Sequence, residues 1–378
     1  MIRALSVAAA LTFTLAPAGT TERVSVSATG DQAEAESWGD AISADGRYVL
    51  FDSHAPNLVP GDSNEATDVF LHDRQTGETT RVSIASSNTQ AIGFSGDGEI
   101  SADGRYVAFD SYARNLVPND TNGGEDVYLR DLQAGKTMRF DVSSYGHQAS
   151  RGSQTSSPAI SADGRYVAFL SNATNLVSGD TNRLTDIFVR DRKRGRTVRV
   201  SVGPRGRQAR DPRSRNGSVA PSISADGRFV AFVSTATNLV SSDTNRMPDV
   251  FVRDRARRRT TRVSLASSGR QAKLESGVPV ISPDGRLVAF SSYSALVPGE
   301  QAGVGQLFVR DLQAGTITLA SRSSDGEAGD DSSTAAGFSA DGRYLAFSSW
   351  ARNLVPDDTN GLLDVFVHDF GSCASCSR

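Results

Sequence analysis

A nine-residue motif that recurs six times constrains the fold of this 378-residue chain more than any other feature. The motif reads Ser-Ala-Asp-Gly-Arg-Tyr-Val-Ala-Phe with minor changes, and successive copies lie 57 to 63 residues apart. The aspartates of the six copies are Asp45, Asp103, Asp163, Asp226, Asp284 and Asp341. Such a period is the signature of a repeat architecture, in which each unit buries its apolar surface against its neighbours.

The repeat around Asp163 can be read strand by strand. Residues 158–161 are short and extended, and the Asp-Gly turn leads into the apolar run 166–170. Residues 186–191 and 197–202 give two further strands that are rich in Ile, Phe and Val. Because the second strand is apolar on both faces, it must be covered on both faces. Four antiparallel strands in each of six repeats predict an all-β fold, a six-bladed β-propeller.

The two ends of the sequence predict how the ring closes. The last repeat stops after Asp369 without a fourth strand, whereas residues 21–26 match the fourth strand of other repeats, such as 261–265. We therefore expect residues 23–27 to pair with the blade formed by 344–348 and 365–369. This pairing would hide two strand edges that otherwise invite aggregation.

The N-terminal residues predict export. Arg3 precedes an apolar run over 4–16, and Ala16-Pro17-Ala18 fits a signal-peptidase site. We expect a signal peptide over 1–18, a propeller over 19–371, a short tail over 372–378, and a secreted or extracytoplasmic location. No apolar run reaches the roughly 18 residues of a membrane span. Cys373 and Cys376 lack the second ligand pair of a zinc site, so a small disulfide or no function remains for them.

The six Ser-(Ala/Pro)-Asp-Gly-Arg motifs resemble the propeller repeats of the TolB type, which also occur in the N-terminal domains of prolyl oligopeptidase-like enzymes. The resemblance covers nearly the whole mature chain. It implies a propeller that interacts with other proteins outside the cytoplasm. The hydrolase domain of the oligopeptidase relatives has no counterpart in this sequence.

Motifs of catalysis are missing from the sequence. It contains neither the G-x-S-x-G nucleophile elbow nor the H-E-x-x-H zinc motif. We therefore expect a non-catalytic, monomeric binding or protein-interaction module. The alternative is an extracellular hydrolase or lyase with its site at the central opening of the ring. Convergent carboxylates there would favour an enzyme, and equivalent residues repeated around the rim would favour a scaffold.

Charge is distributed unevenly along the chain. Residues 190–273 contain 21 Lys and Arg against six Asp, a net charge of +15, so the remainder carries −18. A solvated Arg-rich surface explains this basic arc, and the alternative is a site for an anionic surface polymer, which is the expected partner beside an unknown protein. The arc lacks the interleaved aromatic residues that stack on bases, which disfavours nucleic acid.

A D-x-N-x-x-x-D pattern comes after the second strand in five repeats. Alternating oxygen ligands suit a hard cation such as calcium, whereas capped turns are the alternative. We expect these loops on the face opposite the Asp-Gly-Arg turns. The fifth repeat has Glu300, Ala302 and Gln306 at these positions and should bind no ion. The predicted metal ligands are Asp62, Asn64, Asp68, Asp120, Asn122, Asp126, Asp180, Asn182, Asp186, Asp243, Asn245, Asp249, Asp358, Asn360 and Asp364.

Overall fold

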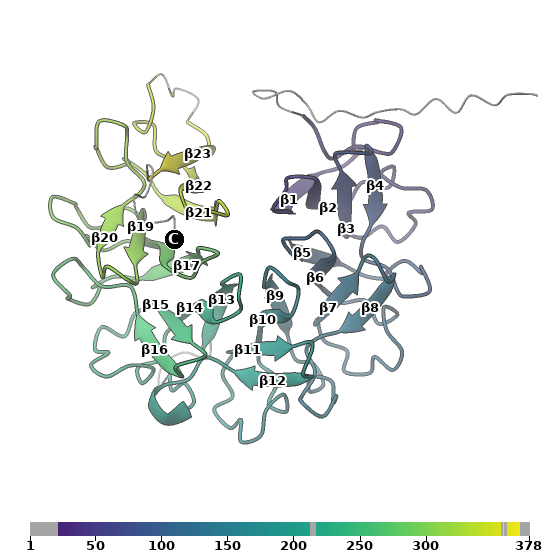
Figure 1. Cartoon of the computed structure of the whole chain (residues 1–378), viewed down its shortest axis with the longest axis horizontal. Coiled ribbons are helices and arrows are strands. Elements are labelled where there is room, and N and C mark those ends of the chain that lie inside the picture. Colours follow the sequence, from purple (N-terminus) through teal and green to yellow (C-terminus); the bar gives the residue numbers. More distant parts are fainter. Residues whose placement is uncertain (1–21, 212–216, 357, 359–360, 371–378) are drawn as a thin grey trace, which may run out of the picture.

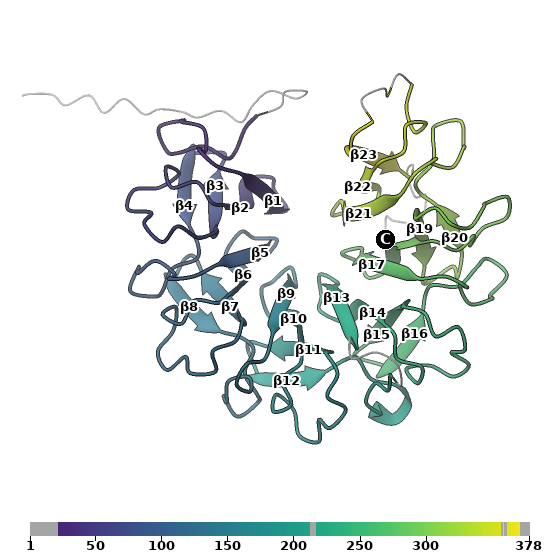
Figure 2. The same ribbon diagram turned by 180° about the vertical axis from the view of Figure 1, so that it is seen from behind.

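The computed structural model describes residues 22–211, 217–356, 358 and 361–370. These residues form 23 strands in six antiparallel sheets around a common axis (Figures 1 and 2). The predicted all-β, six-bladed propeller is thereby confirmed. The predicted signal peptide, Cys373 and Cys376 lie outside the described residues. No helix within the described ranges has the length and apolar character needed to cross a membrane.

Each blade is one consecutive run of strands. Blades 1 to 3 are formed by β1 (Ser37–Ile42), β2 (Tyr48–Ser53), β3 (Asp68–Asp73), β4 (Glu78–Arg81); β5 (Ser95–Ile100), β6 (Tyr106–Ser111), β7 (Asp126–Asp131), β8 (Lys136–Arg139); and β9 (Thr155–Ile160), β10 (Tyr166–Ser171), β11 (Asp186–Asp191), β12 (Arg196–Arg199). Blades 4 to 6 are formed by β13 (Ser218–Ile223), β14 (Phe229–Ser234), β15 (Asp249–Asp254), β16 (Arg259–Arg262); β17 (Ser276–Ile281), β18 (Leu287–Ser292), β19 (Gln306–Asp311), β20 (Ile317–Leu319); and β21 (Ser333–Phe338), β22 (Tyr344–Ser349), β23 (Asp364–Asp369). A short 3-10 turn, Pro204–Gly206, joins blades 3 and 4.

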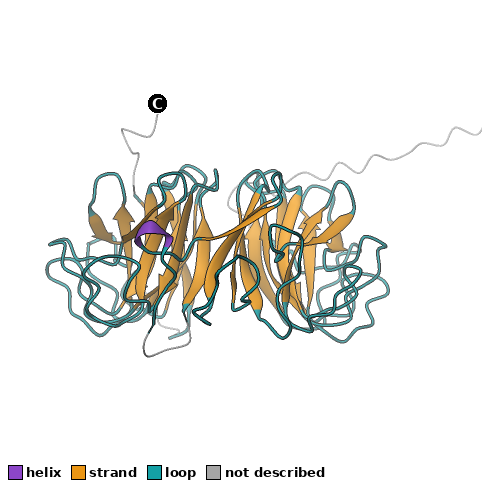
Figure 3. Ribbon diagram, turned by 90° about the horizontal axis from the view of Figure 1, so that it is seen from below, coloured by secondary structure: helices purple, strands orange, loops and turns teal. Residues whose placement is uncertain are grey.

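The first strand of each blade lies nearest the axis, and neighbouring first strands contact each other. Each first strand contains a bulge in its pairing with the second strand. Viewed from the side, the molecule is a disc with loops on both faces (Figure 3). The apolar core lies between consecutive blades, where, for example, Ile187 and Val189 of blade 3 pack with Phe232 of blade 4. The propeller therefore gains its stability from blade stacking.

Every polar residue of the recurrent motif has a structural task. In blade 3 the Ser161 hydroxyl donates to Asp163 and accepts the Tyr166 N–H, and Asp163 accepts the Arg165 N–H. The Arg165 guanidinium forms a two-pronged pair with Asp191, at 2.9 and 3.0 Å. The glycine of the motif has a φ of 62° to 73° in all six blades, the left-handed region that favours glycine. The motif thus stabilises the hairpin between the first and second strands, and it recurs because every blade contains this hairpin.

The two kinds of loop lie on opposite faces, as predicted. The Arg165–Asp191 pair joins the Asp-Gly-Arg turn to the end of β11, so these two connections share one face. On the other face, the Gln208 side chain after β12 donates to the Thr181 hydroxyl in the Asp/Asn loop. The separation arises from a four-stranded meander, in which alternate connections lie at opposite ends of the strands.

The predicted pairing of residues 23–27 with the last blade is not found in the part of the chain that the structure describes. The sixth sheet has three strands, and β23 has no fourth strand beside it among the described residues. Its Val365 and Val367 are 73% and 66% exposed. Residues 22–33 contact blade 1, where Thr79 donates to the Val26 carbonyl. Thr137 makes the same contact with the carbonyl of Ile84 in the preceding blade. The N-terminal segment is thus docked against blade 1, and no described strand pairs with the outer edge of β23 (Figure 1).

Candidate functional site: a cationic cavity between two blades

The structure places an arginine between the outer aspartates of the Asp/Asn loops. In blade 3, Arg199 of β12 lies 3.0 Å from both Asp180 and Asp186. Asn182 donates to the Asp186 carboxylate and accepts the Leu184 N–H, which is turn capping. The guanidinium therefore provides the positive charge at the place where the sequence predicted calcium.

The same triad occurs in blades 1, 2 and 4. The arginine side chains are 7–9% exposed, so these are buried ion pairs. The triads are Arg81 with Asp62 and Asp68, Arg139 with Asp120 and Asp126, and Arg262 with Asp243 and Asp249. Asn64, Asn122 and Asn245 each donate to the last aspartate of their loop.

Metal binding by these loops stays a prediction. Among the described residues, no three His, Cys, Asp or Glu side chains are grouped to hold a metal ion. In blade 6, Asp358 and Asp364 are described and Asn360 is not. Sequence reasoning missed the arginine, although its signal was present: an arginine occupies the same position of the fourth strand in the first four repeats, and Leu319 replaces it in the fifth.

Blade 5 shows the effect of replacing the arginine. Leu319 pairs with Phe308 in the register where Arg199 pairs with Phe188. Both carboxylate oxygens of Glu300 are buried without a hydrogen-bond partner, and burial raises the pKa of Glu300 to about 7. The fifth blade thus keeps an acidic group and lacks its cation.

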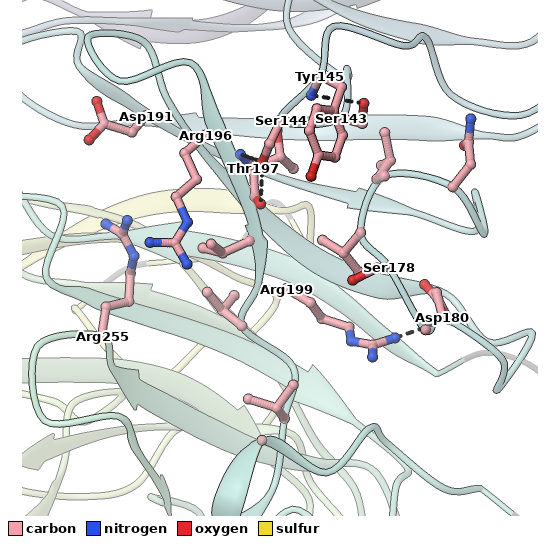
Figure 4. A pocket seen from close by; sticks show the side chains of 18 of the residues that line it. Ser143, Ser144, Tyr145, Ser178, Asp180, Asp191, Arg196, Thr197, Arg199 and Arg255 are labelled. Carbon is pink, nitrogen blue, oxygen red and sulfur yellow. Dashed lines mark hydrogen bonds and ion pairs between the residues drawn. The ribbon is translucent and has the colours of Figure 1, made fainter.

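The basic arc surrounds a cavity of about 1290 Å³ between blades 3 and 4. Its walls come from the loop after β8, the loop 174–181, strand β12, and the end of β15 with the turn beyond it. Figure 4 shows the side chains of Arg196 and Arg255 reaching toward each other from the two blades, while Arg199 is directed to Asp180. Two segments about 60 residues apart in sequence therefore meet at one site.

Most of the charge in this cavity is uncompensated. Its two aspartates, Asp180 and Asp191, already pair with Arg199 and Arg165. The remaining arginines make no ion pair with any carboxylate in the described part of the chain; they are Arg194, Arg196, Arg253, Arg255 and Arg258. A concave surface with unpaired guanidinium groups attracts anions such as carboxylates, sulfates and phosphates.

Arg253 is the most unusual of these groups. The equivalent Arg190 and Arg310 hydrogen-bond to backbone carbonyls of the preceding blade, as well as to groups of their own blade. Arg253 is 8% exposed and donates one described hydrogen bond, to Thr260 at 3.0 Å. The rest of its guanidinium faces the cavity.

Burial and like charge act on these cations. Burial and the nearby Arg258 lower the pKa of Arg253, and burial lowers the pKa of Arg255, whose guanidinium lies 4.4 Å from the centre of the Tyr166 ring. Arginine stays charged despite such shifts. An anion bound here would relieve the repulsion between the two blades. The sequence predicted the basic arc, but only the blade packing forms the cavity.

Comparisons with known proteins identify the fold. No family model matches the chain, and no curated protein matches its sequence. A TolB structure from Agrobacterium tumefaciens is 17% identical, covering 76% of this chain and 81% of its own, with a TM-score of 0.45. An oligogalacturonate lyase from Vibrio parahaemolyticus is 13% identical over 89% of both chains, with a TM-score of 0.43.

A prolyl endopeptidase structure gives a TM-score of 0.52 at 12% identity. It matches 89% of this chain, which spans 41% of the endopeptidase. The chain is thus similar in fold to part of this endopeptidase.

Proposed function

We propose that this protein is a non-catalytic, extracytoplasmic binding module whose cationic cavity takes anionic groups of a surface polymer. Arg253 carries the proposal, because a guanidinium that is 8% exposed and lacks a carboxylate partner in the described chain is costly unless a ligand supplies the charge. The equivalent Arg130 and Arg310 are buried to the same extent, so it is the hydrogen bonding that sets Arg253 apart: they donate to backbone carbonyls of the preceding blade, and Arg253 makes no such bond among the described residues.

A polymer fits better than a single small anion because a second cavity of about 540 Å³ adjoins the first. The two share Arg253 and Arg258, and the second also contains Arg259 and Arg262. A chain with regularly spaced negative charges would contact both cavities at once. Each further contact raises affinity by making the next binding event intramolecular.

Titration of the protein with polygalacturonate, a carboxylated polymer, tests the proposal, and neutral dextran is the uncharged control. Arg253→Gln keeps a donor for Thr260 and removes the charge, so binding should weaken by at least about tenfold. Arg257→Gln is the matched control, since Arg257 is on the turn that follows the strand of Arg253, its side chain is 78% exposed, and it lines neither cavity. Equal loss in both variants, or no binding by the native protein, would contradict a dedicated site.

The second candidate function is a hydrolase or lyase with its site at the central opening. One observation favours it: Asp40 of β1 and Asp52 of β2 form a close carboxyl pair near the axis. Burial raises the pKa of Asp40 to about 6 and that of Asp52 to about 9. At neutral pH one group is then a base and the other an acid, the division of roles that acid–base catalysis requires. Bond cleavage in polygalacturonate that disappears in Asp52→Asn would support this function, and intact polymer after long incubation would exclude it for that substrate.

Calcium binding by the Asp/Asn loops is a further proposal. Three side chains give three or four oxygens, so water and backbone carbonyls would complete a weak site, near the roughly 0.1–1 mM range of extracellular modules. Calcium would compete with the guanidinium of the triad. Melting temperatures that rise with calcium and fall with chelator would support binding, and identical curves would leave the loops as capped turns. Export is tested by the N-terminal mass of the secreted chain, which should begin at Gly19.

A further inference from the structure

Six carboxyl groups of blades 1 and 2 lie near one another, with Asp97 close enough to the other five to raise the pKa of each. They are Asp40, Asp52, Asp97, Glu99, Asp110 and Glu125. The positions of Asp52 and Asp110 are occupied in blades 3 to 5 by Leu170, Val233 and Ser291. The cluster is therefore not part of the repeat, and the common fold does not require it.

Backbone geometry brings these groups together. Asp97 lies at the bulge of β5 with a φ of 53°, and its N–H donates to Asp52 at 3.0 Å. A Cβ at Gly96 would lie 2.8 Å from both the Asp52 carboxylate and the Phe94 ring. A Cβ at Gly98 would lie 3.0 Å from the Asp40 carboxylate. Two glycines thus leave the space into which the carboxylates converge.

Within the described chain, no cation balances this charge. None of the six carboxyl groups pairs with a Lys, Arg or His of the described ranges. Asp52 is 8% exposed, and neither its Oδ1 nor Oδ2 of Asp40 accepts an N–H or hydroxyl from the described residues; at these atoms the two carboxyl groups have only each other. Burial raises the pKa of Asp110 to about 9 and that of Glu125 to about 7. A buried, unpaired acceptor next to an exposed acid, Asp97, is the arrangement that a cationic ligand would complete.

Exposed aromatic rings flank the carboxylates. Phe94 and Tyr112 are 43% and 48% exposed and meet edge to face at 6.4 Å, and Trp38 meets His54 at 5.9 Å. These rings lie at the same strand ends as Asp52, since Trp38 pairs with Asp52 across the sheet and Phe94 lies against it. Aromatic faces attract ammonium and guanidinium groups, and they do so most strongly where water is excluded.

We propose that this end of the axis binds an organic cation, an ammonium or guanidinium group such as a lysine or arginine side chain carries, between the Asp97 carboxylate, the Asp52 carboxyl group, which would release its proton when the cation binds, and the Phe94 ring. A metal ion is the weaker fit, because within the described chain no three acidic or imidazole groups are arranged around one point. Carboxylates with an aromatic wall match a group that combines charge with an apolar stem.

Tetralysine is the probe and tetraglutamate its acidic counterpart, titrated by calorimetry into the full mature chain. Asp97→Asn should weaken tetralysine binding by at least about tenfold. Asparagine tolerates the positive φ of this position and keeps the N–H that Asp52 accepts, so the fold should survive. Glu78→Gln, an exposed acid on the outermost strand of blade 1, is the matched control and should bind as the native chain does.

Phe94→Leu tests the aromatic wall and should weaken tetralysine binding by a few-fold. Absence of tetralysine binding, equal loss in Asp97→Asn and Glu78→Gln, or equal affinity for tetraglutamate would each overturn the proposal. Polygalacturonate binding should be unchanged in Asp97→Asn, so failure here is distinct from failure at the cationic cavity.

Discussion

Gly164 and Gly195 share a φ of 62° but differ in their surroundings. A Cβ on Gly164 would collide with the Tyr106 ring of the preceding blade, whereas nothing lies within 4 Å of a Cβ on Gly195. The same contact joins Gly104 to Tyr48 and Gly227 to Tyr166. At these positions glycine is needed twice: it adopts the positive φ of the turn, and it leaves room for the aromatic ring of the preceding blade.

Gly164→Ala should therefore lower the free energy of unfolding well beyond Gly195→Ala. The backbone conformation alone costs about 1–2 kcal/mol in either variant. The displaced Tyr106 ring should add about 1–3 kcal/mol of overpacking to Gly164→Ala only. Urea denaturation of the two variants measures the difference. Equal losses would mean that the Tyr106 ring moves aside without a cost in stability.

Asp52 makes stability depend on pH. Its pKa is raised from 3.8 to about 9 in the folded state, so the folded chain holds a proton there that the unfolded chain releases above its own pKa. Stability from this group is therefore lost as the pH rises from about 4 to 9. Asp52→Asn should be more stable than the native protein at pH 8–9, with the difference shrinking toward pH 4. Parallel melting curves at all pH values would contradict this.

At the scale of the strand, the arginine of the fourth strand ties the outer edge of a blade to the loop that precedes the third strand. Arg139 on β8 is buried between Asp120 and Asp126, and Asp141 lies close by. Burial raises the pKa of Asp126 and, more strongly, that of Asp141. Removing the cation would leave these acids without their main partner.

Arg139→Leu should reduce stability by about 3–5 kcal/mol, the usual loss when one partner of a buried ion pair is removed. Arg105→Leu is the control, because the Arg105 side chain is 40% exposed and solvent screens its pairing with Asp131, so the loss of stability should be small. Denaturant unfolding at pH 7 distinguishes the two. Similar losses would show that burial of the triad matters little.

At the scale of the whole molecule, residues 22–33 already form the loop that follows the fourth strand in other blades, with a Val26–Gln32 bridge equivalent to Val202–Gln208. Arg23 donates to Gln32 as Arg199 does to Gln208, and Asn57 donates to the Gln32 carbonyl at 2.8 Å. Within the described chain, the pairing with β23 is not made, and the valines of that strand are exposed. Closing the ring would bury these residues and pair both edges.

Amide exchange tests whether the outer edge of β23 is open. Because no described strand pairs with that edge, its N–H groups should exchange rapidly in the native chain, and deletion of residues 19–29 should not speed their exchange. The N–H groups of β23 that bond to β22 should stay protected in both chains. Slow exchange at the outer edge that is lost in the deletion variant would contradict the open edge.

The sequence determines the repeat, the strands, the hairpin turns and the face on which each loop lies. All of these depend on local chemistry, such as the Ser161–Asp163–Arg165 turn, or on a pattern copied six times. The sequence also revealed the basic arc through its excess of Lys and Arg, and the Asp/Asn loops through the D-x-N-x-x-x-D pattern.

Tertiary structure decides which charges meet. Arg196 and Arg255 form one cavity because adjacent blades stack, and Arg199 lies between two aspartates because β12 ends beside their loop. The carboxylates of blades 1 and 2 depart from the repeat, so no internal comparison reveals that they converge at the axis. Electrostatic interaction depends on distance and burial, and both are set by how the blades pack.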